Sequence, residues 1–148
     1  MKITRVEVTP KQGDGLKDVR GDLIKRQLKA DHSIEIAEIR SIVGFLVSSD
    51  IPSQDIAERC DDLFADPIIE HSLTDALFLE SRDIYPNIPD AAISVGFKPG
   101  VTDNPGKAAL DGFTTLFPNT DTDSDISTYI TYVLSLIHIS EPTRQLQI

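Results

Sequence analysis

Cysteine and tryptophan are almost missing from this sequence of 148 residues, which holds Cys60 as its one cysteine and no tryptophan. A single cysteine excludes a disulfide within the chain and fits a reducing compartment. No apolar run approaches the roughly 20 residues that cross a bilayer. The first ten residues, MKITRVEVTP, also lack the apolar core of a signal peptide. These absences predict a cytoplasmic location and no membrane partner.

Basic residues are scarce as well. The chain has 14 lysines and arginines against 24 aspartates and glutamates, and its formal net charge is −10. Nucleic acids and anionic membranes are bound by basic surfaces, so neither is predicted as the main partner. The remaining composition, 40% hydrophobic and 26% charged, is typical of a globular protein.

Residues that usually carry chemistry are few and scattered. His32 and His71 have no ligand partner at helical or hairpin spacing, and Cys60 lies on the apolar face of an expected helix. The acidic stretch 121–125, DTDSD, opens like a calcium loop but has Ile126 where that loop needs glycine. We therefore predict no catalytic, cofactor-binding or metal-ligating residue in this chain.

The spacing of apolar residues predicts strands alternating with helices. The expected long strands are 2–9, 34–49, 91–97 and 126–133, the short strands 67–73 and 76–80, and the helices 19–30, 53–65 and 104–117.

Two short stretches resemble each other and indicate an internal repeat. GLKDVRG at 15–21 and GVTDNPG at 100–106 share their glycines and their aspartate at an offset of 85 (103 − 18). Each follows an expected strand and precedes an expected helix, so an aspartate there can cap the helix. The second stretch lacks the lysine-serine end of a P-loop and the spacing of a dinucleotide-binding loop.

We predict that these stretches are structural turns and helix starts, with an anion at the N-terminus of the second helix as the alternative. Asp103 or Asn104 could act as the cap, and proline suits the first turn that follows. The residues predicted to shape the two turns are Asp18, Gly21, Gly100, Asp103, Asn104, Pro105 and Gly106.

The end of the sequence looks foreign to the rest. Residues 134–148 read LSLIHISEPTRQLQI, and the first eleven match an in-frame translation of a transposase-type sequencing adapter. We predict that this segment is a non-native tail and that the natural sequence is read only to about Val133. The predicted fold and function therefore concern residues 1–133.

The stretch 96–104, GFKPGVTDN, resembles a motif in the N-terminal region of phosphoribosylformylglycinamidine synthase in its long, single-chain bacterial form. DPIIEHSLTD at 66–75 and ISTYITYV at 126–133 are similar to further stretches of that region. The resemblance covers nearly all of residues 3–133.

The resemblance implies an α+β fold like that of a small accessory subunit of this family. That subunit has the order β-α-β-β-α-β, with helices on one face of an antiparallel sheet. Applied to the repeat, it gives a first unit at 1–83, a linker at 84–91 and a second, truncated unit at 92–133.

The resemblance also implies a function for the parent protein, a ligase of de novo purine biosynthesis. It uses ATP, Mg and glutamine to convert formylglycinamide ribonucleotide into formylglycinamidine ribonucleotide. The region resembled here is expected to dock between the synthetase core and the glutaminase domain and to contain neither active site. The alternative is a free-standing small accessory or anion-sensing module.

Overall fold

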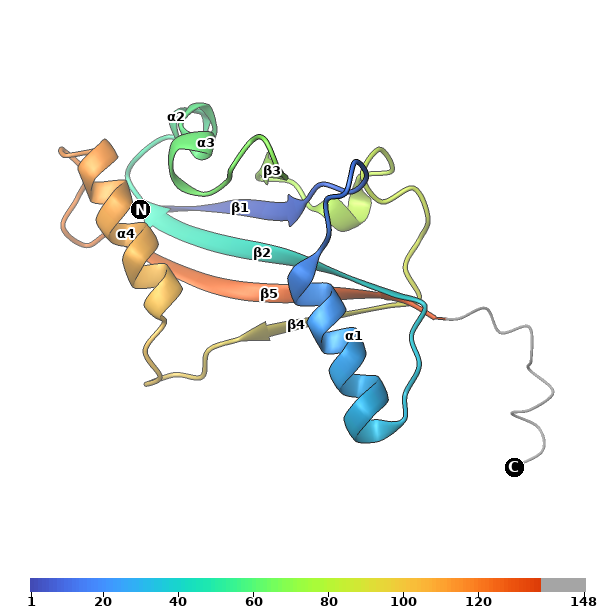
Figure 1. Ribbon diagram of the computed structural model, residues 1–148. Coiled ribbons are helices and arrows are strands. Elements are labelled where there is room, and N and C mark those ends of the chain that lie inside the picture. The colour runs from blue at the N-terminus through green and yellow to red at the C-terminus, as the bar shows by residue number, and fades with distance from the viewer. Residues whose placement is uncertain (137–148) are drawn as a thin grey trace.

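A five-stranded antiparallel sheet forms the centre of the computed structural model, which describes residues 1–136 (Figure 1). The strand order is β3-β1-β2-β5-β4. The strands are β1 (Lys2–Pro10), β2 (Glu38–Ser49), β3 (Glu70–Thr74), β4 (Ala91–Gly96) and β5 (Asp125–Ser135). The helices are α1 (Val19–His32), α2 (Ser53–Glu58), α3 (Cys60–Leu63) and α4 (Asn104–Leu116), with a short 3-10 helix η1 (Phe78–Glu80). The α+β class and the antiparallel sheet agree with the prediction.

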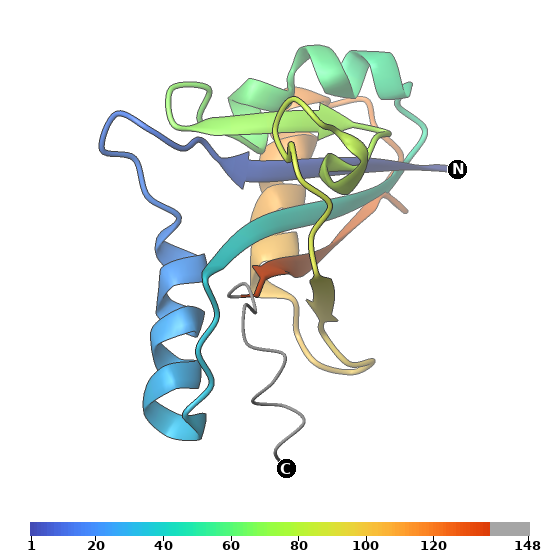
Figure 2. The ribbon, with the colours of Figure 1, turned by 90° about the vertical axis from the view of Figure 1, so that its right-hand side faces the viewer.

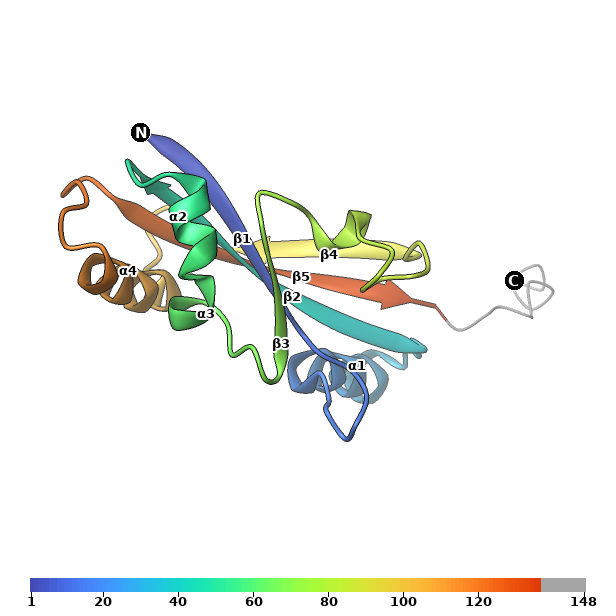
Figure 3. The same cartoon turned by 90° about the horizontal axis from the view of Figure 1, so that it is seen from above.

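The four α-helices lie on one face of the sheet, here called the helical face. Val6 and Val8 of β1 point to this face and form a buried cluster with Ile56 of α2, Cys60 of α3 and Phe113 of α4. Figure 2 shows α4 behind the strands and the segment that contains η1 in front of them. Seen from above, α1 and α4 also lie on the same side of the strands (Figure 3).

The opposite face is covered by irregular chain instead of a helix layer. Phe78 and Tyr85 pack there against Ile42 and Val133. The expected strand at 76–80 is wrong, because this stretch forms η1 and the turns beside it. Phe78 is fully buried against the face of the sheet and Leu79 is partly buried beside it, so the stretch does not extend an edge.

The expected helix at 53–65 is broken into α2 and α3 at Arg59, whose ψ of 10° departs from helical values. The predicted apolar spacing still holds, since Ile56, Cys60 and Phe64 all lie in the buried cluster of the helical face. The first residues of the expected strand at 34–49 instead connect α1 to β2, which begins at Glu38.

The predicted non-native tail is only partly within the described residues. Leu134 and Ser135 continue β5 and pair with Ile39 and Glu38 of β2. Residues 137–148 lie outside the described part of the chain.

The pairing of β1 with β2 is repeated in the pairing of β4 with β5 at a constant offset in residue number. Val43 pairs with Ile130, which follows it by 130 − 43 = 87 positions. The pair of Val6 and Phe45 has its counterpart, at the same offset, in the pair of Ile93 and Tyr132. The arms β1-α1-β2 and β4-α4-β5 therefore lie in corresponding positions on either side of the Val43–Ile130 pair.

Candidate functional site

Asp18 fixes the start of α1 against β2. Its Oδ1 accepts hydrogen bonds from the N–H of Gly21 and the hydroxyl of Ser41, both at 2.8 Å. Its Oδ2 accepts from the N–H of Ser41 at 2.5 Å. The residue is 6% exposed. Both carboxylate oxygens are therefore used in tying a helix cap to a neighbouring strand.

Asp103 makes the corresponding contacts at the start of α4. Its Oδ1 accepts from the N–H of Gly106 at 2.7 Å and from the hydroxyl of Thr128 at 2.8 Å. Its Oδ2 accepts from the N–H of Thr128 at 2.6 Å. The contacts of Asp18 and Asp103, with their glycines and strand hydroxyls, are called here the two capped corners.

Gly21 and Gly106 let each helix approach its strand closely. A Cβ added at Gly21 would lie 2.1 Å from the carbonyl oxygen of Ile39, and one at Gly106 would lie 2.4 Å from that of Ile126. Both neighbours are backbone atoms, which cannot move aside as a flexible side chain can. The two stretches of the repeat share these glycines, and the close approach is their physical reason.

The other predicted turn residues lie in or beside the second corner. Gly100 has a φ of +85° in a turn closed by the N–H of Val101 and the carbonyl of Lys98. With proline before it, Gly100 meets the requirements of a type II turn. Asp103 is the cap, and Asn104 and Pro105 are the first two residues of α4.

The second corner is poorly suited to an anion. The N–H of Gly106 already donates to Asp103, and the N–H of Lys107 donates to the carbonyl of Asp103. An anion arriving at this helix start would also meet the carboxylate that caps it. The geometry thus favours the structural interpretation of GVTDNPG over the anion site.

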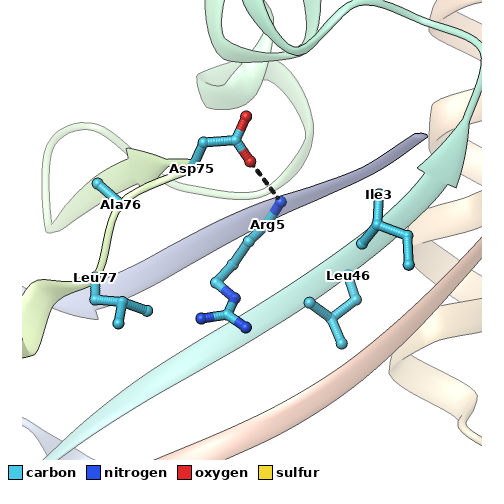
Figure 4. Close-up of a pocket in the computed structure, with 6 residues that line it drawn as sticks. All are labelled: Ile3, Arg5, Leu46, Asp75, Ala76 and Leu77. Carbon is cyan, nitrogen blue, oxygen red and sulfur yellow. Dashed lines mark hydrogen bonds between the residues drawn. The ribbon is translucent and has the colours of Figure 1, made fainter.

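A hollow of about 260 Å³ opens on the face opposite the helices (Figure 4). Ile3, Arg5 and Leu46 line it from β1 and β2, and residues 75–77 line it from the segment after β3. The backbone N–H of Arg5 donates to Oδ1 of Asp75 at 3.1 Å, and this bond is the main reason that the pKa of Asp75 is lowered. A carboxylate kept ionised and already bonded is a weak candidate for a general base.

Glu7 is a buried carboxylate that the sequence analysis missed. It is 4% exposed, and its Oε1 accepts from the N–H of Phe78 at 2.9 Å. Its Oε2 accepts from the hydroxyl of Tyr129 at 2.8 Å. Burial, and then Glu7 itself, raise the pKa of Tyr129, which keeps the phenol protonated. The sequence did hold a signal for this carboxylate, since Glu7 stands between Val6 and Val8 within an expected strand.

Removing the hydroxyl with Tyr129→Phe is expected to lower the free energy of unfolding by about 1–3 kcal/mol, because Oε2 of Glu7 stays buried without this donor. The ring should keep its place across Gly44, where an added Cβ would meet it. Urea unfolding followed by circular dichroism measures the change. Tyr132→Phe is the matched control, because Tyr132 is a half-buried tyrosine of the same strand that lies on the helical face. Equal stability of the two variants would contradict the hydrogen bond between Tyr129 and Glu7.

Metal and thiol chemistry find little support in residues 1–136. No group of three or more histidine, cysteine, aspartate or glutamate side chains is placed there to hold a metal ion. Cys60 is buried, and its burial raises the pKa of the thiol, which disfavours a nucleophilic thiolate. None of the helices described is long and apolar enough to cross a membrane.

No protein-family model, curated protein or solved structure matches this chain. The resemblance seen in GFKPGVTDN at 96–104 stays a prediction from the residues. What the structure adds is the role of those residues in the second capped corner.

Proposed function

We propose that this chain is the N-terminal docking region of phosphoribosylformylglycinamidine synthase and that it is itself non-catalytic. One observation carries the proposal. The motif at 96–104 forms the passage from β4 to α4, and its carboxylate, Asp103, is bound by three donors of the fold. A motif whose polar groups serve the scaffold suits a docking module better than an active site.

The capped corners and the constant register offset support two copies of one unit. The first copy takes residues 1–83, residues 84–91 are the linker, and the second, truncated copy takes residues 92–133. Two equivalent aspartates, each bonded to a hydroxyl residue of the following strand, are explained most simply by duplication.

In the parent enzyme, this region would bridge the synthetase core and the glutaminase domain in the cytoplasm. The ATP, Mg and glutamine chemistry would belong to those domains and not to this chain. Docking requires a rigid surface, and the backbone and hydroxyl donors that hold the two aspartates fix each helix to its strand. A free-standing anion sensor is supported less well, because Asp103 already caps the helix start it would use.

The test begins with the source gene, amplified and read past the codon of Val133. We expect the frame to continue into a synthetase and a glutaminase. In the enzyme without residues 1–133, glutamine-dependent formation of formylglycinamidine ribonucleotide should fall at least ~10-fold more than the ammonia-dependent reaction. The ammonia-dependent activity is the control for a folded core. A frame without a synthetase, or equal loss of both activities, would overturn the proposal.

A further inference from the structure

The corresponding strands β1 and β4 are covered very differently. β1 pairs with β2 on one side and with β3 on the other. Within residues 1–136, β4 pairs with β5 alone, and all six of its residues are exposed. Figure 1 shows α2 and α3 beside the β1 end of the sheet and no such pair at the β4 end of the described chain.

The exposed side chains of β4 occupy positions that are buried in the first arm. At the register offset of 87, Ile93 corresponds to Val6 and Val95 to Val8. Val6 and Val8 are 0% and 2% exposed, whereas Ile93 and Val95 are 54% and 53% exposed. The difference arises because α2, α3 and β3 cover the first pair.

The helices repeat this difference. Ala109 and Phe113 of α4 are buried in the cluster that α2 and α3 complete. Ile24 and Leu28 follow Asp18 at the same distances along α1, yet they are only half-buried. We call Ile24, Leu28, Ile93 and Val95 the uncovered patch.

The chain leaves β5 close to this patch. Val133, the last residue predicted to be natural, pairs with Arg40 of β2 on one side of β5 and with Ala92 of β4 on the other. In the first arm, the chain that leaves β2 forms α2, α3 and then β3.

We propose that the uncovered patch is the seat of a helical segment and an antiparallel strand that follow β5 in a longer form of this chain. This inference rests on the duplication proposed above. β3 begins at Glu70, so its counterpart would begin near 70 + 87 = 157, beyond the printed Ile148. The new strand would pair with the free edge of β4, and the helical segment would set apolar residues against Ile24 and Leu28.

The test compares the chain ending at residue 136 with one in which the natural sequence continues from Val133 to about residue 170, the counterpart of residue 83 at the offset of 87 (83 + 87 = 170). Hydrogen exchange of residues 91–96 is the readout. We expect exchange in the extended monomer to slow at least ~10-fold. Val95→Asp should restore fast hydrogen exchange in the extended chain and should leave exchange in the short chain nearly unchanged. Val101→Asp, in the exposed turn before α4, is the matched control.

Three results would overturn the inference: unchanged exchange in the extended monomer, protection only in a concentration-dependent dimer, or a natural frame that ends before residue 157. The first two can occur while the frame still encodes a synthetase, so the inference would fail and the proposed function would stand. If β4 were protected in a frame without a synthetase, the inference would stand and the proposed function would fail.

Discussion

Replacing Gly106 by alanine is expected to lower the free energy of unfolding by about 3 kcal/mol, at the upper end of the cost of overpacking. The new Cβ would lie 2.4 Å from the carbonyl oxygen of Ile126 and close to the carboxylate of Asp103. Relief requires α4 to move away from β5, which would also stretch the hydrogen bonds of the second capped corner. Urea unfolding measures the loss, with one value of m, the dependence of the unfolding free energy on urea concentration, fitted to the wild type and the variant.

Gly96→Ala is the matched control on the adjoining strand. A Cβ there meets nothing closer than 3.9 Å, so its expected effect is within about 0.5 kcal/mol. Gly21→Ala should resemble Gly106→Ala, since its Cβ would approach the carbonyl oxygen of Ile39 even more closely. A Gly106→Ala protein as stable as Gly96→Ala would contradict the close packing of α4 on β5.

Local patterns in the sequence predict the helix starts well. An aspartate three residues before a glycine, after a strand and before an apolar periodicity, has few other uses. Both aspartates do cap their helices. The sequence could not predict the strand partners, because Ser41 and Thr128 lie 23 and 25 residues away from their aspartates. Only the folded sheet brings these groups together.

The stretch at 76–80 shows that a short apolar run predicts burial of its largest residue, Phe78, more reliably than it predicts a strand. Its apolar residues follow one another without a break, and Phe78 and Leu79 pack onto the face of the sheet that the helices leave open. A short apolar run looks the same in either position. The buried bond between Glu7 and Tyr129 is hidden from the sequence for a related reason, since the two residues are 122 positions apart in the chain.

Removing the carboxylate of the first corner with Asp18→Ala is expected to lower the free energy of unfolding by about 3 kcal/mol, since hydrogen bonds to a charged group contribute about 1.5–3 kcal/mol. The loss leaves the N–H of Ser41 without this acceptor at a position that is fully buried. Asp22→Ala, in the exposed first turn of α1, removes a charge of the same sign without touching the corner. Urea unfolding of the two variants side by side measures the difference.

A double-mutant cycle with Ser41→Ala separates the bond from the Ser41 hydroxyl to Asp18 from general damage to the helix. If that bond stabilises the fold, the double variant should lose clearly less stability than the two single losses combined. Asp18→Asn should fall between wild type and alanine, because one oxygen still accepts while an amide N–H₂ faces the N–H of Ser41. Additive losses in the cycle would mean that the hydroxyl of Ser41 contributes no stability through Asp18, and the backbone N–H of residue 41 and the packing of Gly21 would alone tie the helix to the strand.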